Sequence, residues 1–171
     1  MKNFIRTLLL VCTVIFTGNA WALNPLNGDY VCSRLNPDYN KERCYELVDS
    51  AYIDPYAAGV CDRYSSSDTT LACIEIIRNY RFDTFALSAC DSYTDANTTN
   101  TCLQVIAGQF MQSNAVTACN RITDANLTTT CFSAIAGKQF YDRDVWECDS
   151  MNTAEATISC FQIRGNGGCR L

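Results

Sequence analysis

The spacings C-x11-C and C-x16-C alternate along this chain without a break, which gives the cysteines a period of 29. The ten cysteines in this series are Cys32, Cys44, Cys61, Cys73, Cys90, Cys102, Cys119, Cys131, Cys148 and Cys160. A fixed period of this size is typical of stacked supersecondary units, each too small to bury its hydrophobic face alone. The cysteine spacing therefore predicts a repeat fold of about five units.

The residues between the cysteines repeat with the same period. The run Ser88–Phe110 returns one period later as Thr117–Gln139, including the tetrapeptide TDAN and the tripeptide IAG. Residue types that start helices occupy one column: Asn36, Ser65, Thr94, Thr123 and Asn152. Types that end helices dominate a second column, about half a period later: Ser50, Asn79, Gly108, Gly137 and Asn166. Each unit is therefore predicted to contain a long helix of about 13 residues.

A shorter helix is predicted after each long one. It opens at Asp54-Pro55 in the first unit and at Asp83 in the second, with weaker signals at Ser113 and Asp142. Two further segments are interpreted as lone helices, a short one at 29–34 and a long one at 152–164. In the long helix, apolar residues stand one, three and four positions after the cysteine, which indicates one buried face. Arg164 breaks this pattern in the last unit, as expected where a stack meets water. We expect an all-α, α-solenoid fold.

The segment 1–22 has the features of a secretory signal peptide. Lys2 and Arg6 precede an apolar run from Leu8 to Thr17, and Ala20-Trp21-Ala22 forms a cleavage site. We therefore expect a mature chain of residues 23–171, secreted or periplasmic, folded as a single domain. Cleavage removes Lys2 and Arg6, so the mature chain has 11 basic and 18 acidic side chains and a net charge of −7. This charge argues against nucleic-acid binding and against attachment to anionic membranes.

Export to an oxidising compartment predicts that the cysteines form disulfides. In one register each long helix bonds to the short helix after it. The pairs are then Cys44–Cys61, Cys73–Cys90, Cys102–Cys119, Cys131–Cys148 and Cys160–Cys169, with Cys32 unpaired. In the other register the pairs run from Cys32–Cys44 to Cys148–Cys160, with Cys169 unpaired. Counting helical rise from each turn places Cys61 and Cys73 about 9 Å out of level. The first register is therefore preferred, and the odd cysteine allows a disulfide dimer as the alternative to a monomer.

No catalytic or metal-binding pattern emerges from the residues. The chain contains no histidine, so triads and zinc sites that use imidazole are excluded. The cysteines are too far apart for zinc or thiol-oxidoreductase motifs. The carboxylate pairs Glu42 with Glu46, and Glu147 with Asp149, have the pattern of solvated helix faces. We expect no enzyme activity and no cofactor.

Two further groups of residues have both a structural and a functional interpretation. Asn97 and Asn126 begin formal glycosylation sequons, but they also fall at a helix start. Most aromatic residues follow the repeat and are predicted to be core first and binding surface second. They are Tyr45, Tyr52, Tyr56, Tyr80, Phe82, Phe85, Phe110, Phe132, Phe140, Tyr141 and Trp146.

The order Ala-Cys, Thr-Asp-Ala, Cys and Ile-Ala-Gly resembles the disulfide-bridged tetratricopeptide-like repeats of secreted bacterial cysteine-rich proteins. The period of 29 is shorter than in that family, and the cysteine spacing is wider. The resemblance implies an α-solenoid that binds a protein or peptide on its concave side. We therefore expect an exported, non-enzymatic interaction module. The alternative is a cell-envelope structural protein or a secreted effector or inhibitor.

Overall fold

The computed structural model describes residues 26–165, and this part of the chain forms ten α-helices and no strand. Five short helices are α1 (Gly28–Ser33), α3 (Pro55–Cys61), α5 (Thr84–Asp91), α7 (Ser113–Cys119) and α9 (Asp142–Asp149). Five long helices are α2 (Asp38–Val48), α4 (Ser67–Ile77), α6 (Ala96–Ile106), α8 (Ala125–Ile135) and α10 (Ala154–Arg164). The predicted signal peptide (residues 1–22), the expected mature start at residue 23, the predicted helix end Asn166, and Cys169 lie outside the described residues.

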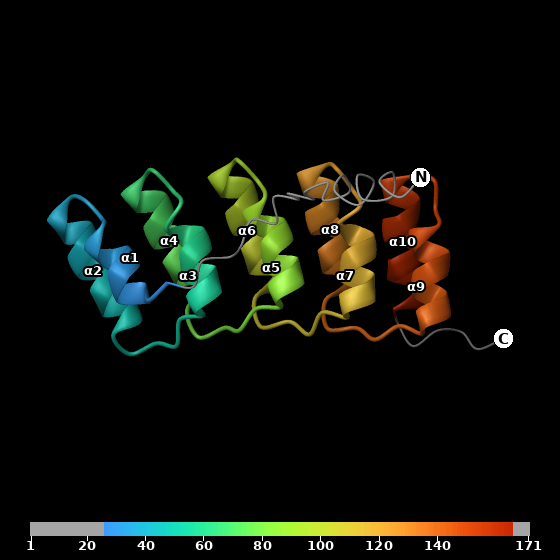
Figure 1. Ribbon diagram of the computed structural model, residues 1–171, viewed down its shortest axis with the longest axis horizontal. Coiled ribbons are helices and arrows are strands. Elements are labelled where there is room, and N and C mark those ends of the chain that lie inside the picture. Colours follow the sequence, from blue (N-terminus) through green and yellow to red (C-terminus); the bar gives the residue numbers. More distant parts are fainter. Residues whose placement is uncertain (1–25, 166–171) are drawn as a thin grey trace, which may run out of the picture.

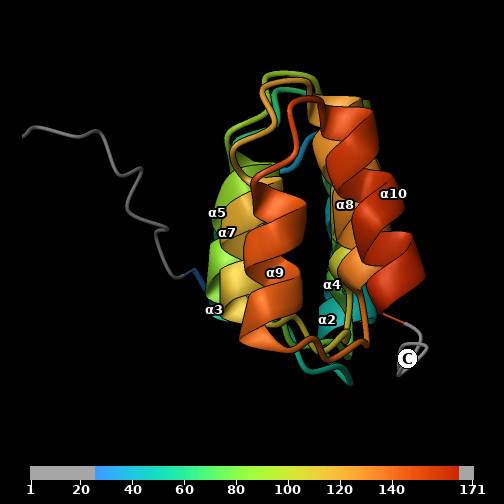
Figure 2. The same ribbon diagram turned by 90° about the vertical axis from the view of Figure 1, so that its right-hand side faces the viewer.

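The helices form a two-layered stack (Figures 1 and 2). The short helices follow one another in one layer and the long helices in the other, and consecutive members of each layer are in contact. Each short helix also packs against the long helix that follows it, so α1–α2, α3–α4, α5–α6, α7–α8 and α9–α10 form hairpins 1 to 5. The fold is a helical-repeat solenoid, as the cysteine spacing predicted.

The preferred disulfide register is wrong. The structure pairs Cys32–Cys44, Cys61–Cys73, Cys90–Cys102, Cys119–Cys131 and Cys148–Cys160. Each bond therefore lies within one hairpin, between a short helix and the next long one. Cys32 is bonded and not free, and the segments read as lone helices are the first half of hairpin 1 and the second half of hairpin 5.

The prediction failed because it treated the turn after each short helix as helical. Cys61 is the last residue of α3, and residues 62–66 lead into α4 without forming an α-helix. An extended residue advances the chain by about 3.3 Å, against 1.5 Å for a helical one. The turn therefore carries the chain beyond the end of α3. Helix α4 then runs back alongside α3 and brings Cys73 next to Cys61, with a distance of 5.5 Å between their Cα atoms.

The other connections carry the chain from one hairpin to the next. We call these segments (residues 49–54, 78–83, 107–112 and 136–141) the crossover loops, and they line the lower edge of the molecule in Figure 1. Cys73 and Cys90 lie on either side of such a loop, so they belong to different hairpins. The turns within hairpins line the opposite edge, which we call the turn edge.

The long helices begin later than predicted. Their N-caps are Pro37, Ser66, Asp95, Asp124 and Thr153, one residue after the predicted column, and each helix has 11 residues. The side chains of Asp95, Asp124 and Thr153 accept hydrogen bonds from first-turn amides. These acceptors satisfy donors that a helix end would otherwise leave unpaired. The residues before them, Thr94, Thr123 and Asn152, were therefore misassigned as caps.

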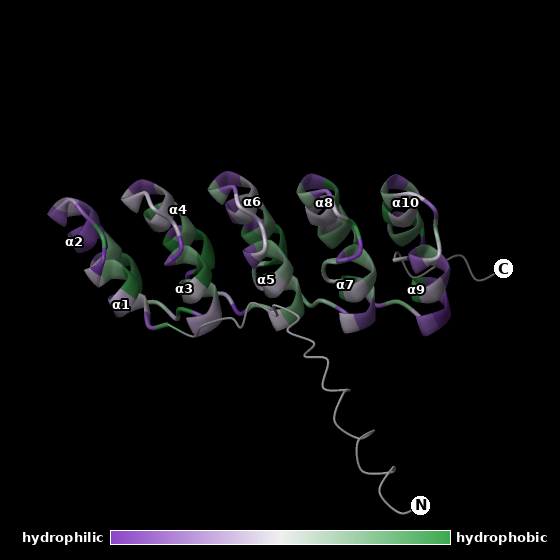
Figure 3. Cartoon of the chain, turned by 45° about the horizontal axis from the view of Figure 1, so that its top comes forward, coloured by the Kyte–Doolittle hydropathy of each residue, from purple (hydrophilic) through white to green (hydrophobic). Residues whose placement is uncertain are grey.

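The core lies between the two layers and between successive hairpins, where the hydrophobic residues gather (Figure 3). The residue directly after the second cysteine of each hairpin is fully buried in hairpins 2 to 5. These residues are Ile74, Leu103, Phe132 and Phe161. Tyr45 occupies the same column in hairpin 1 but is exposed, because hairpin 1 is the first hairpin of the described residues. Among the described helices, none is both long and apolar enough to cross a membrane.

Candidate binding surface

Most of the predicted aromatic core is on the surface. Of the eleven aromatic residues named above, only Phe82, Phe132 and Phe140 are buried. The other eight are exposed, so the structural interpretation of these eight is wrong. Six of the exposed residues lie in the crossover loops or in the first turn of the short helix that follows: Tyr52, Tyr56, Tyr80, Phe85, Phe110 and Tyr141. We call these six residues the aromatic edge.

A backbone ladder joins the crossover loops to one another. The amides of Asn79, Gly108 and Gly137 donate to carbonyls in the preceding crossover loop, at N–O distances of 2.7, 3.2 and 2.9 Å. The acceptors belong to Tyr52, Arg81 and Phe110. All three donors have φ between 64° and 68°, a conformation that glycine and asparagine adopt most readily. The helix-ending column of the sequence thus sets the spacing of the residues along this edge.

Side chains add further bonds between successive loops. The buried carboxylate of Asp54 caps α3 by accepting from the amides of Tyr56 and Ala57, and its second oxygen accepts from Phe82 of the next loop. The Gln112 amide both accepts from the Phe140 amide at 2.7 Å and donates to its carbonyl at 3.1 Å. These contacts hold the crossover loops in a fixed order.

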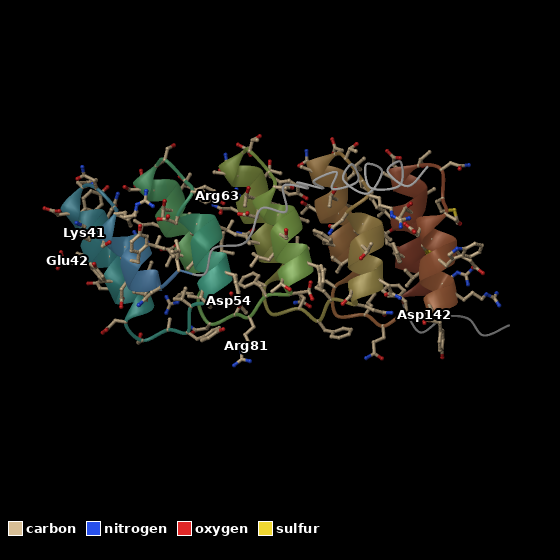
Figure 4. The ribbon with its side chains drawn as sticks, viewed as in Figure 1. Lys41, Glu42, Asp54, Arg63, Arg81 and Asp142 are labelled. Carbon is tan, nitrogen blue, oxygen red and sulfur yellow. A yellow bond between two sulfur atoms is a disulfide. The ribbon has the colours of Figure 1, made fainter. Side chains whose placement is uncertain are left out.

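The aromatic edge also carries basic side chains without acidic partners. The Arg81 guanidinium lies 5.5 Å from the ring centroid of Tyr52, and it projects from the lower edge in Figure 4. Arg78 and Lys138 lie in the same loops, and no described carboxylate forms an ion pair with either. By contrast, the six other described arginines all form ion pairs.

The turn edge is held together by ion pairs between successive hairpins. Arg34 bonds to Asp62, Arg63 to Asp91 and Arg121 to Asp149, each pair 28 residues apart. Figure 4 places Arg63 on this edge, opposite Arg81. Burial raises the pKa of the Asp91 carboxyl, and the Arg63 charge offsets part of that increase.

The two ends of the stack carry charged residues where inner hairpins carry apolar ones. At the first end, Asp29, Glu42 and Tyr45 occupy the columns of the buried Ala58, Leu71 and Ile74. They line a shallow hollow of about 560 Å³ on α1 and α2, together with Asp38, Lys41, Glu46 and Asp49. Figure 4 shows Lys41 and Glu42 on this outer helix. The hollow is the face that would meet a preceding hairpin.

At the last end, Asp144, Glu147 and Arg164 occupy the columns of the buried Ala115, Ala118 and Ile135. These three charges satisfy one another, because Arg164 bonds to Asp144 at 3.0 Å and to Glu147 at 2.6 Å. Terminal repeats of solenoids need such polar outer faces. The break that Arg164 makes in the sequence pattern is therefore a cap.

The two candidate carboxylate pairs lie at opposite ends of the stack. Glu42 and Glu46 are exposed on the first end. Glu147 accepts from Arg143 and Arg164, the first of which lowers the pKa of its carboxyl, and Asp149 is paired with Arg121. Within residues 26–165, no three histidine, cysteine, aspartate or glutamate side chains are grouped to hold a metal ion. Asn97 and Asn126 are exposed on the first turns of α6 and α8.

The sequence signals of the aromatic edge were present but were assigned to the core. Its residues stand in or beside segments bounded by helix-ending and helix-starting residues, which the sequence marks as loops. A comparison of the chain with known family models, with curated proteins and with solved structures gives no match in any of the three.

Proposed function

We propose that this protein is an exported, non-enzymatic interaction module that presents its aromatic edge to a protein partner. The observation that carries the proposal is the row of exposed rings along the crossover loops, among them Phe85 at 60% and Phe110 at 55% exposure. Exposed aromatic residues in one row mark interaction surfaces, since interfaces are enriched in Tyr, Phe and Arg. Export is supported by the five disulfides, which are typical of oxidising compartments.

The edge is suited to binding because it is ordered before a partner arrives. Backbone bonds fix Arg81 and Phe110 relative to the next loop, and the disulfides fix the hairpins behind them. A surface that is already rigid loses less conformational freedom on association. Arg78, Arg81 and Lys138 favour a partner that combines apolar side chains with carboxylates. The resemblance to disulfide-bridged repeat proteins pointed to the concave side of a solenoid, whereas this proposal places the interface on an edge.

The test is site-specific photocrosslinking in the native compartment. A photoreactive phenylalanine analogue replaces Phe85 or Phe110. In a matched control it replaces Tyr39, which is similarly exposed but lies in the first turn of α2, at the turn edge. We expect one discrete adduct from the two edge positions and none from position 39. The purified partner should then bind the Phe85→Ser and Phe110→Ser variants at least ten-fold more weakly, as expected for aromatic anchors of an interface.

The same experiment gives results that would contradict the proposal. Equal adducts from positions 39, 85 and 110 would indicate unspecific collision. The absence of any adduct would support a structural role in the envelope. In a separate assay, a catalytic activity that disappears with one Asp or Glu substitution, while the fold remains intact, would indicate an enzyme.

A further inference from the structure

The turn edge contains a column of five residues, of which the first four lie at the junctions between successive hairpins and the fifth belongs to hairpin 5. In order along the chain they are Leu35, Tyr64, Tyr93, Ile122 and Met151. Each lies two or three residues after the end of the short helix of its hairpin. Two of the grooves are therefore occupied by a tyrosine of the chain itself. The other residues in the column are aliphatic.

Tyr64 shows how such a groove accommodates a phenol ring. Its hydroxyl group donates to Oδ1 of Asn100 in the next hairpin at 2.9 Å. Burial raises the pKa of Tyr64 to about 12, and a hydrogen bond with Thr99 acts in the opposite direction. The charges of Arg63 and Asp91 also act on the hydroxyl group. The groove therefore combines apolar walls with a threonine and an ion pair near the hydroxyl.

The groove between hairpins 4 and 5 keeps the ion pair and the threonine but lacks the tyrosine and its acceptor, since Ile158 stands two periods after Asn100. Arg121, Asp149 and Thr157 stand two periods after Arg63, Asp91 and Thr99, and Arg121 and Asp149 again form an ion pair. The counterpart of Tyr64 is Ile122, which is shorter and has no hydroxyl group. A hollow of about 290 Å³ lies here. Its lining includes all four of these residues and the apolar side chains of Leu127 and Met151.

We propose that this hollow binds a phenolic ring from outside the chain, in the position that Tyr64 occupies two hairpins earlier. The ring packs on Ile122, Leu127 and Met151, and its hydroxyl group is received by Thr157 and the Arg121–Asp149 pair. Met151 is exposed, so the hollow opens to solvent on the turn edge. The site lies on the opposite edge from the proposed protein interface and does not depend on it.

The test is a titration of the full secreted protein with N-acetyl-tyrosinamide, followed by the amide resonances in NMR spectra. We expect saturable shifts at Ile122, Met151 and Thr157, and none at Leu35. N-acetyl-phenylalaninamide, which lacks only the hydroxyl group, should bind about five-fold more weakly, as expected for one lost hydrogen bond. A parallel titration with p-cresol distinguishes the source: tighter binding of cresol indicates a small phenol, and tighter binding of the tyrosine amide indicates a peptide.

Two variants keep the proposal falsifiable. Ile122→Tyr supplies the ring from the chain itself, so it should abolish binding and raise the melting temperature. The control Ile163→Tyr, at an exposed isoleucine outside the hollow, should bind as the unchanged protein does. Thr157→Val should weaken binding of the tyrosine amide without affecting that of the phenylalanine amide. Undiminished binding by Ile122→Tyr, equal affinity for both amides, or the absence of saturable shifts would each overturn the proposal.

Discussion

Arg63 of hairpin 2 and Asp91 of hairpin 3 form an ion pair, with Nη2 of the arginine 2.5 Å from Oδ1 of the aspartate. The same nitrogen donates to the backbone carbonyl of Asp91. At the next junction both positions are neutral, because Ser92 replaces the arginine and Asn120 replaces the aspartate. The two columns therefore change together, which avoids a carboxylate held between hairpins without a cation.

Removal of Arg63 should destabilise the protein more than removal of its counterpart Arg121. In Arg63→Ala the Asp91 side chain, which is 7% exposed, loses its cation. We expect a loss of about 1–3 kcal/mol in the free energy of unfolding. Arg121→Ala leaves the more exposed Asp149 and should change stability by about 0–1 kcal/mol. Urea denaturation measures both values.

A double variant provides the control for this comparison. Arg63→Ser with Asp91→Asn copies the neutral pair of the following junction, so it should be more stable than Arg63→Ala alone. Equal losses in Arg63→Ala and Arg121→Ala, or no recovery in the double variant, would show that the ion pair does not stabilise the junction.

Ionisation of Tyr64 should destabilise the fold at alkaline pH. Burial raises its pKa in the folded state from 10.0 to about 12, so the unfolded chain loses this proton first. The stabilising contribution is therefore complete below about pH 10 and is lost as the pH rises towards 12. Tyr64→Phe should remove this part of the pH dependence and, at neutral pH, destabilise by about 1 kcal/mol through the lost hydrogen bond.

Ultraviolet titration of the two proteins measures the effect directly. The difference between the unchanged protein and Tyr64→Phe should show one phenol that ionises well above the exposed tyrosines. A difference curve centred near pH 10, the ordinary value for tyrosine, would contradict the burial of Tyr64.

Replacement of Gly108 by alanine should destabilise the protein more than the same change at Gly137. Both residues have positive φ, so both variants lose about 1–2 kcal/mol from backbone strain. At Gly108 the new Cβ would also lie 2.8 Å from a ring carbon of Tyr80, whereas at Gly137 its nearest neighbour is Gln109 Oε1 at 3.3 Å. Thermal melting should therefore rank Gly137→Ala above Gly108→Ala. The reverse order would show that the contact between the new Cβ and Tyr80 does not determine the loss of stability.

The charged cap on α9 and α10 should prevent association of the stack ends. The triple variant Asp144→Ala, Glu147→Ala and Arg164→Ile restores the residues of hairpin 4 at these positions. It exposes an apolar face beside Ile163, which is already exposed, and should form dimers or larger species. Sedimentation velocity detects them. A triple variant that is folded and remains monomeric at high concentration would show that these charges do not act as a cap.

The repeat, the helices and most of the buried columns could be predicted from the sequence because they follow from one period. The register of the disulfides could not, since it depends on whether the residues from Asp62 to Ser66 are helical or extended. Local sequence does not determine this conformation, because serine and tyrosine occur in both helical and extended segments. The long helices were predicted to start one residue too early for the same reason. Thr94 and Asp95 are both acceptable N-caps, so local sequence does not decide between them.

The aromatic edge was assigned to the core because periodicity does not distinguish buried from exposed aromatic residues. Phe82 lies in a crossover loop and Phe85 directly after it, yet Phe82 is buried and Phe85 faces water. The Phe82 amide donates to Asp54 of the preceding crossover loop, a contact between hairpins that the period does not reveal. Tyr64 and Tyr93 likewise recur one period apart in the sequence. Their position in the grooves between hairpins could not be predicted, because the sequence does not show how successive hairpins pack.

The most direct test of the stapled-hairpin account is cleavage at methionine under denaturing, non-reducing conditions. Met111 lies between Cys102 and Cys119, and Met151 lies between Cys148 and Cys160. With bonds inside hairpins, mass spectrometry should find two pieces: one that ends at residue 111, and one from 112 to the C-terminus joined across Met151 by Cys148–Cys160. Bonds between hairpins would instead join the chain across Met111 and release the piece after Met151, and that result would contradict the account.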